Sequence, residues 1–317
     1  MAIKRFEILF LLLLALLVPT WAPLDLARTA QGKSKQAIEV VTQRPLVLSL
    51  SATRIISQVT APPLLKASTT ESAAVETPIP TPMPTWVWNP PGEVVAPILL
   101  YHHIAEKTPA SRYFISPPVF EAQMRSLQRW GYTIIPLSLL VRAMTEGADL
   151  PPKPVVITFD DGFEDVFKYA FPCLKRYGFS AVVYAIAGQT GLGNYMDAAQ
   201  LRALSDAGWE IGSHSWTHAS LRSLDVDLGR EIADSRQALE EMLDKPVETF
   251  SFPYGLTSKF VTGEVKDAGY LAAVGLGISY RHTEKTRYYL SRIEVRSDYD
   301  LKAFASLLPW KPGDSNQ

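Results

Sequence analysis

Cysteine is almost absent from this chain of 317 residues, in which Cys173 stands alone. A single thiol cannot form a disulfide within the chain, and it cannot supply a cysteine-rich zinc site. Cys173 lies in the segment AFPCLKRYGF, whose apolar residues recur at helical spacing. We therefore expect it to be a buried thiol of the core rather than a reactive group.

An excess of basic residues is lacking as well. The chain has 31 Lys and Arg against 32 Asp and Glu, which gives a formal net charge of −1 at pH 7. Nucleic-acid-binding proteins usually show a basic patch or a strongly positive charge, so we expect no nucleic-acid partner. With 47% hydrophobic and 20% charged residues, the composition is that of a globular protein with a sizeable core.

The N-terminus lacks an apolar run of full membrane-spanning length. A positively charged start is followed by an unbroken apolar run from Ile8 to Val18. This pattern is typical of a signal peptide, and the run is short for a membrane span of about 20 residues. We expect residues 1–27 to be a signal peptide or, if uncleaved, a membrane anchor. The protein would then be extracytoplasmic, either secreted or anchored to the outer face of the cytoplasmic membrane.

Residues 28–95 have the composition of a linker. The stretch ETPIPTPMPTWVWNPPGE alternates proline with threonine, which favours extended polyproline geometry and a semi-rigid spacer. We expect a largely disordered Pro/Thr-rich linker here, followed by a folded domain over residues 96–312.

Strand-like and helix-like segments alternate about seven times from residue 96 onward. The strand-like runs are ILLY, VVITF, SAVVYAIA, WEIGS, ETFSF and YLAAVG. They lack clean polar alternation, which indicates strands buried on both faces of a parallel sheet or a barrel. In α/β barrels the chemistry collects at the carboxyl ends of strands, so the residues after these runs are the candidates for a functional site.

Polar side chains and a Pro-Tyr pair follow four of these runs. They are His102 and His103 after ILLY, Asp160 and Asp161 after VVITF, His214 and His218 in HSWTH after WEIGS, and Pro253 and Tyr254 after ETFSF. The remaining histidine, His282, lies in the polar segment YRHTEKTR, where we expect a solvated loop.

The histidines of HSWTH are spaced four residues apart. On a helical turn, His214 and His218 would point the same way, and with one carboxylate they would make a three-ligand site with open positions. A cation there would also offset the repulsion between Asp160 and Asp161. The alternative is structural, because a histidine or an aspartate can cap a helix and DDG alone would fit a turn.

Two segments resemble motifs of the polysaccharide deacetylases of carbohydrate esterase family 4, the NodB homology group. TFDDG, with Asp160 and Asp161, resembles the first motif, and HSWTH, with His214 and His218, resembles the second. The resemblance covers roughly residues 96–310 and implies an α/β fold, a distorted (β/α)7-type barrel. It also implies that Asp160 is the general base and that Asp161, His214 and His218 bind a divalent metal, in this family usually zinc (Zn2+).

The third motif of this family, R-x-P-[YF], is matched only in part by SFPYG. Pro253 and Tyr254 match and would contact the substrate, whereas Ser251 stands where an arginine is expected to orient the catalytic aspartate. The resemblance implies that the backbone N–H of Tyr254 stabilises the oxyanion.

The general acid of the family is a histidine. The segment ILLYHHI resembles the N-terminal Y-H motif of the exopolysaccharide deacetylases that act on poly-β-1,6-N-acetylglucosamine, which implies that His102 is the acid. His103 is the alternative, because neighbouring strand residues point to opposite sides. The more favoured reading of His103 is a core histidine.

The resemblance thus implies a metal-dependent hydrolase that removes acetyl groups from N-acetylglucosamine units of an extracellular polysaccharide and releases acetate. Trp216 and Tyr195 are expected to pack against sugar rings. One alternative is a deacetylase or amidohydrolase acting on peptidoglycan, chitin oligomers or a small amide. Another is a non-catalytic glycan-binding protein on the same fold, which the absence of arginine at Ser251 favours.

Overall fold

The computed structural model describes residues 85–107 and 109–311, so the expected signal segment and most of the expected linker lie outside the described residues. The last residues of that linker contain strands β1 (Val87–Asn89) and β2 (Val94–Val95). These strands pair with β7 (Ala148–Leu150) and β13 (Arg281–His282), so the folded domain begins ahead of residue 96. None of the helices in the described ranges combines the length and the apolar character needed to cross a bilayer.

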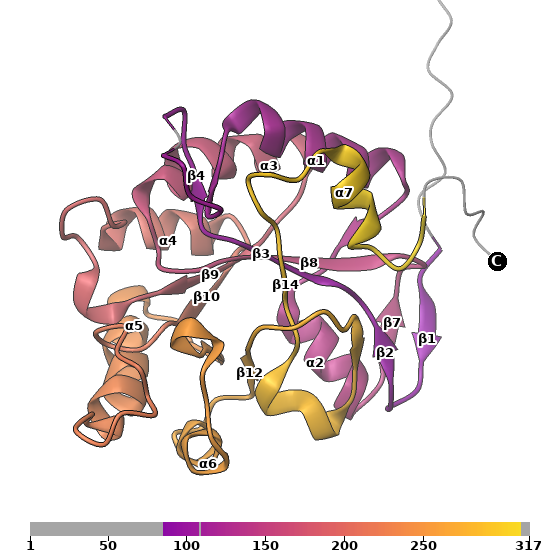
Figure 1. Cartoon of the computed structure of the whole chain (residues 1–317). Coiled ribbons are helices and arrows are strands. Elements are labelled where there is room, and N and C mark those ends of the chain that lie inside the picture. The colour runs from indigo at the N-terminus through magenta and orange to yellow at the C-terminus, as the bar shows by residue number, and fades with distance from the viewer. Residues whose placement is uncertain (1–84, 108, 312–317) are drawn as a thin grey trace, which may run out of the picture. The chain divides into compact units, whose positions relative to one another are not determined.

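A curled sheet of eight strands forms the scaffold (Figure 1). The strand order is β12-β11-β10-β9-β8-β3-β14, and β6 pairs with the start of β8. The bounds are β3 Ile98–Tyr101, β6 Thr133–Ile134, β8 Pro154–Phe159, β9 Val182–Ala185, β10 Glu210–Ser213, β11 Thr249–Ser251, β12 Ala272–Val274 and β14 Ile293–Glu294. Every pairing in this sheet is parallel, and the sheet forms a half-barrel, which confirms the predicted distorted barrel.

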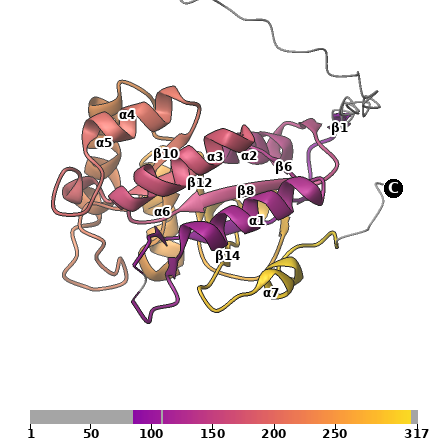
Figure 2. The same ribbon diagram turned by 90° about the horizontal axis from the view of Figure 1, so that it is seen from above.

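Helices pack around this sheet. In Figure 2, α1 and α3 lie side by side along β8. The α-helices are α1 Pro117–Arg129, α2 Leu137–Thr145, α3 Phe171–Tyr177, α4 Ala198–Asp206, α5 Ser235–Leu243, α6 Lys259–Asp267 and α7 Leu301–Ser306. Short π- or 3-10-helical segments are η1 Val166–Ala170, η2 Ala187–Gln189, η3 Gly229–Asp234, η4 Pro253–Gly255 and η5 Glu284–Tyr289. A small parallel pair, β4 (His103–Ile104) and β5 (Phe114–Ile115), lies outside the main sheet.

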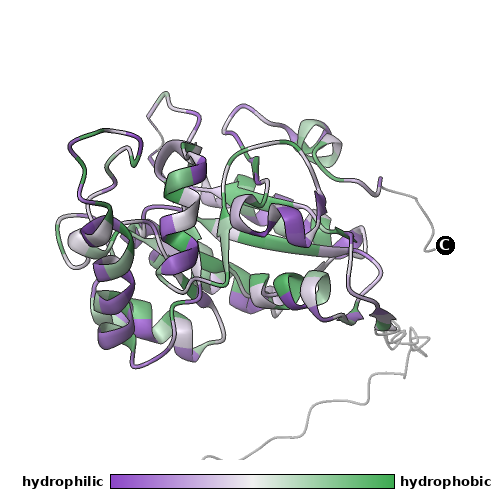
Figure 3. Ribbon diagram, turned by 90° about the horizontal axis from the view of Figure 1, so that it is seen from below, coloured by the Kyte–Doolittle hydropathy of each residue, from purple (hydrophilic) through white to green (hydrophobic). Residues whose placement is uncertain are grey.

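Alternate residues of β8 enter two hydrophobic clusters. Ile157 and Phe159 pack with the surrounding helices in the larger cluster, whereas Val156 packs with Tyr184 and the apolar face of α2 in the smaller one. The hydropathy colouring of Figure 3 shows this layering, with green strands in the middle and purple patches on the helices. Because side chains alternate along a strand, Asp160 continues the row of Val156 and lies on the inner face.

Two expectations about single residues have opposite outcomes. Cys173, on α3, is a buried core thiol as predicted, and burial raises the pKa of the thiol to about 11. The prediction of a solvated loop for His282 was wrong. His282 is fully buried on β13, with its Nε2 atom 3.0 Å from the carbonyl oxygen of Ala96. The neighbouring residues are mostly polar, so the sequence does not indicate that β13 pairs with β2.

Candidate active site

A cavity of about 490 Å³ opens beside the carboxyl ends of β3, β8 and β10. It brings together the residues predicted to be catalytic or metal-binding: His102, Asp160, Asp161, His214, His218 and Tyr254. Trp216, Tyr195 and Pro253 are not among its lining residues, so their contact with a substrate stays a prediction.

The backbone is left-handed at four non-glycine residues of this region. The φ angles are 72° at Asp161, 67° at Ser215, 65° at His218 and 59° at Tyr254. Such conformations cost of order 1 kcal/mol or more each, and they cluster at functional sites. The turns that follow β8, β10 and β11 are therefore held in place by the structure around them.

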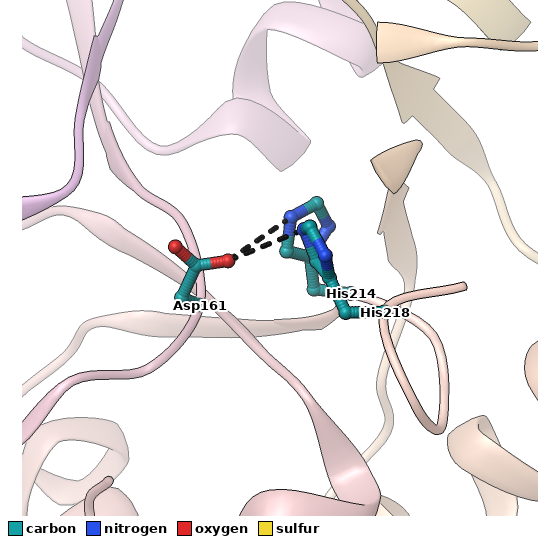
Figure 4. A group of neighbouring side chains, drawn as sticks. All are labelled: Asp161, His214 and His218. Atoms are coloured by element: carbon teal, nitrogen blue, oxygen red, sulfur yellow. Dashed lines mark ion pairs between the residues drawn. The ribbon is translucent and has the colours of Figure 1, made fainter. Parts of the chain in front are cut away.

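Asp161, His214 and His218 converge as a candidate metal centre (Figure 4). The Oδ1 atom of Asp161 lies 3.5 Å from Nε2 of His214 and 3.4 Å from Nε2 of His218. One potential ligand atom from each residue lies within 4.8 Å of the other two. One carboxylate and two imidazoles leave coordination positions open, which is the donor set of a catalytic rather than a structural zinc site.

The tautomer of His214 suits a metal ligand. Its Nδ1 atom lies 2.8 Å from the backbone carbonyl oxygen of Ser251, and a carbonyl can only accept, so Nδ1 carries the hydrogen. Nε2 is then left with a free lone pair, as in histidine ligands whose second nitrogen is fixed by a partner. Burial lowers the pKa of His214 to about 4, which keeps the ring neutral at pH 7.

The expected helical turn over HSWTH was wrong. Residues 214–218 form a loop in which the N–H of His218 donates to the hydroxyl of Ser215 over 2.9 Å. The two rings still approach, with 4.8 Å between their centroids. Left-handed backbone at Ser215 and His218, rather than helical periodicity, brings them together.

Asp160 is paired with an arginine that the sequence motifs did not indicate. Arg292, just before β14, donates from Nη1 to Oδ1 of Asp160 over 2.6 Å and from Nη2 to Oδ2 over 2.7 Å. Both side chains are almost inaccessible, at 1% and 5% exposure. Such a bidentate, charge-assisted pair fixes the plane of the carboxylate as well as its charge.

The other guanidinium N–H groups of Arg292 are also bonded. Nε donates to the carbonyl oxygen of Gly275, Nη1 to the hydroxyl of Thr158, and Nη2 to the hydroxyl of Ser251. Ser251 Oγ in turn donates to Asp160 Oδ2 over 3.2 Å. Ser251 therefore touches the carboxylate through its hydroxyl and His214 through its carbonyl.

The adjacent carboxylates have opposite pKa shifts. Burial acts to raise the pKa of Asp160, but Arg292 and His214 outweigh it and bring that pKa well below its usual range. Burial and the charge of Asp160 raise the pKa of Asp161 to about 7. Asp160 is therefore ionised without a cation, whereas Asp161 is the carboxylate that a cation would stabilise in its ionised form.

The neighbouring histidines have different surroundings. His102 lines the cavity, where Tyr113 packs at 4.6 Å between ring centroids. Burial lowers the pKa of His102 to about 4, against an opposing effect of Asp160. His103 lies between the rings of Phe114 and Phe163, and its Nδ1 is 2.7 Å from Oδ2 of Asp165.

This difference bears on which histidine can act as the acid. His102 shares the inner face with Asp160. The ring of His103 also lines the cavity, but it is fixed by packing and by Asp165. The alternation of side chains along the strand accounts for the separation. The arrangement favours His102 as the residue that meets a substrate.

Comparisons with known proteins agree with this geometry. Residues 147–273, which hold the Asp160–Asp161 pair and both histidines of HSWTH, match the family described as polysaccharide deacetylase. The chain carries a polysaccharide deacetylase domain. The predicted family is confirmed, and with it a hydrolase of carbon–nitrogen amide bonds.

Relatives of the deacetylase domain include curated proteins and solved structures. The chain is 27% identical over 213 residues to YxkH of Bacillus subtilis (strain 168), provisionally named a polysaccharide deacetylase, with 67% of this chain and 75% of the relative covered. It is 24% identical over 201 residues to a poly-beta-1,6-N-acetyl-D-glucosamine N-deacetylase of Staphylococcus aureus (strain MRSA252), covering 59% and 69%. The crystal structure of BA0330 from Bacillus anthracis, provisionally named a polysaccharide deacetylase, is similar with a TM-score of 0.61, 25% identity, and coverage of 68% and 69%.

Some residues of the deacetylase site were missed in the sequence. Arg292 stands in LSRIEV, and an arginine inside an otherwise apolar strand-like run is a signal that a buried anionic partner exists. Tyr113, Arg112 and Glu294 also line the cavity, and Arg112 Nε is 3.2 Å from Glu294 Oε1. These come from loop and strand positions that no motif marks.

Proposed function

We propose that this deacetylase domain is a zinc-dependent N-deacetylase that removes acetyl groups from N-acetylglucosamine units of an extracellular polysaccharide. The observation that carries the proposal is the convergence of three groups in one cavity. These are the Asp161–His214–His218 trio, the Asp160 carboxylate held by Arg292, and His102. The name of the Staphylococcus aureus relative supports a polymer of N-acetylglucosamine as the substrate class.

The proposed metal ligands are Asp161, His214 and His218, through Oδ1 of the first and Nε2 of the two histidines. A divalent cation held there would supply Lewis-acid polarisation of the acetyl carbonyl and make water more acidic. The neutral state of His214 and the fixed Nδ1 hydrogen fit this role.

The chain's own residues would handle the protons. Asp160, ionised and oriented by Arg292, would take a proton from the attacking water. The backbone N–H of Tyr254 would donate to the oxyanion that develops on the carbonyl oxygen. His102, which lines the same cavity as Asp160, would deliver a proton to the leaving nitrogen. The C–N bond breaks, and acetate and a free glucosamine unit leave.

Exposed tyrosines at the rim are suited to sugar rings. Tyr254 is 58% exposed and lies over His218, with 4.6 Å between the ring centroids, and Tyr113 has the same spacing to His102. Aromatic faces at the mouth of a cavity give a polymer apolar surface to stack on. We include Tyr254 and Tyr113 among the proposed substrate contacts, beside Pro253, Trp216 and Tyr195.

The non-catalytic alternative loses its main support. It depended on the absence of an arginine at Ser251, and Arg292 now supplies a guanidinium to the same carboxylate. Action on peptidoglycan, chitin oligomers or a small amide stays open as the alternative substrate. We also propose an extracytoplasmic location and, if the N-terminal segment is uncleaved, contact with the membrane through it.

Acetate release from defined substrates tests the proposal. Zinc-loaded protein should release acetate from β-1,6-linked N-acetylglucosamine polymer faster than from β-1,4-linked chitin oligomers or peptidoglycan. Asp160→Asn should abolish release while zinc stays bound, whereas Asp206→Asn, at an exposed ion pair with Lys245, should behave like the parent protein. Acetate release from peptidoglycan or chitin alone would favour the alternative, and full activity of Asp160→Asn would remove the proposed base.

A further inference from the structure

A buried carboxylate outside the cavity binds the loop that carries His218. Glu231, in η3, is only 4% exposed and does not line the cavity. Its Oε2 accepts hydrogen bonds from the backbone N–H groups of Trp216 at 3.0 Å and Thr217 at 2.9 Å. Its Oε1 accepts from the hydroxyl of Thr217 at 2.6 Å. A buried carboxylate is costly without partners, so these bonds fix Glu231 and the loop to each other.

The opposite edge of the same loop is bonded to η2. The backbone N–H groups of Ala187 and Gly188 donate to the carbonyl oxygens of Ser215 and Trp216 over 3.0 Å and 2.9 Å. A Cβ atom at Gly188 would come within 2.6 Å of the Trp216 carbonyl oxygen, so the approach requires glycine. The loop thus has its carbonyl groups held on one side and its N–H groups held by Glu231 on the other.

The loop needs this support because two of its residues are strained. Ser215 and His218 both have left-handed backbone, and residues in that conformation persist only where their surroundings over-determine it. Without Glu231, two N–H groups and one hydroxyl would lose their acceptor. The loop would then relax toward ordinary backbone angles, which would move the His218 ring.

We propose that Glu231 is a positioning residue for the metal centre, because it folds the 215–218 loop so that Nε2 of His218 stays beside Oδ1 of Asp161. The inference rests on the proposed function of Asp161, His214 and His218 as metal ligands. Glu231 acts through backbone hydrogen bonds, so geometry matters more than charge. A glutamine can reproduce it, since its amide oxygen accepts from both N–H groups and its NH2 group donates to the Thr217 hydroxyl.

Zinc affinity of the full chain tests the inference, measured by competition with a chromogenic chelator in the absence of substrate. Glu231→Ala should weaken zinc binding by about 10- to 100-fold, the range for residues that orient metal ligands. Glu231→Gln should bind zinc nearly as tightly as the parent protein. The matched control Glu241→Ala, an exposed glutamate on α5, should leave the affinity unchanged.

Folding is checked by circular dichroism and thermal unfolding of the metal-free variants. If Glu231→Ala does not fold, Thr217→Val decides, because it removes only the 2.6 Å bond at an exposed residue and should still weaken zinc binding. If folded Glu231→Ala or Thr217→Val binds zinc as tightly as the parent protein, the role of Glu231 is overturned, but the proposed metal centre is not. A parent protein that binds no zinc would overturn the proposed metal centre itself.

Discussion

Replacing Arg292 by glutamine should damage both the stability and the catalysis of this domain. The substitution removes the positive partner of Asp160, a carboxylate whose side chain is 5% exposed, and leaves that charge buried. Breaking a buried ion pair by removing one partner costs about 3–5 kcal/mol. For a domain of this size, each kcal/mol lowers the melting temperature by about 2–4 °C, so we expect a fall of about 6–20 °C.

The catalytic effect follows from the same contacts. Arg292 fixes both oxygens of Asp160, and a base that loses its orientation loses most of its contribution, about 10²- to 10⁴-fold in rate. We expect kcat for acetate release to fall by at least about 10²-fold, with zinc still bound.

The assay pairs thermal unfolding with acetate release and uses Arg296→Gln as the control. Arg296 lies four positions along the chain and pairs with Asp298 at the surface, where an ion pair is worth only about 0–1 kcal/mol. Arg292→Gln combined with Asp160→Asn should be more stable than the sum of the single changes implies, because the double variant buries no lone charge. If Arg292→Gln has the same melting temperature and the same kcat for acetate release as Arg296→Gln, the assigned role of Arg292 is refuted.

Three further predictions concern the histidines and Tyr254. His102→Gln should lower kcat by about 10²-fold or more without loss of zinc, whereas His103→Gln should mainly lower the melting temperature; the reverse result would make His103 the acid. Burial lowers the pKa of His282 from 6.5 to about 4, so the stability that its neutral ring contributes is fully present above pH 6.5. As the pH falls toward 4, the unfolded chain takes up the proton first, and the free energy of unfolding decreases by up to about 3 kcal/mol. The free energy of unfolding measured from pH 7 to 4 should fall less steeply in His282→Gln. Tyr254→Gly should raise KM but largely preserve kcat, because the backbone N–H remains and glycine adopts a φ of 59° without strain; a collapse of kcat would give the side chain a catalytic role.

The α/β scaffold could be predicted from the sequence because its main strands are continuous apolar runs. The segments that became β3, β8, β9, β10, β11 and β12 are buried on both faces, and this pattern separates them from the amphipathic helices. The short strands β1, β2 and β13 were missed, because two- or three-residue pairings leave no periodicity to detect.

The site could be predicted from the sequence only in part. The contacts that were missed include one between residues far apart along the chain. The Asp161–His214–His218 trio follows from strand ends that the fold brings to one rim. The pairing of Asp160 with Arg292 joins residues 132 positions apart, and nothing local in the sequence specifies that contact. The geometry of HSWTH escaped prediction for another reason: left-handed backbone at non-glycine residues contradicts local preference and is imposed by the tertiary structure.

The shared space around Ser251 has an evolutionary consequence. Its hydroxyl lies 2.9 Å from Arg292 Nη2 and 3.2 Å from Asp160 Oδ2, and Ser251 itself is fully buried, so little room remains beside the carboxylate for a second guanidinium. An arginine at position 251 would need the volume that Arg292 fills. Related sequences should therefore covary at these two positions, with arginine at one and a small residue at the other. Arginine at position 251 and arginine at position 292 would support the aspartate equally well, and evolution from one arrangement to the other would require both residues to change.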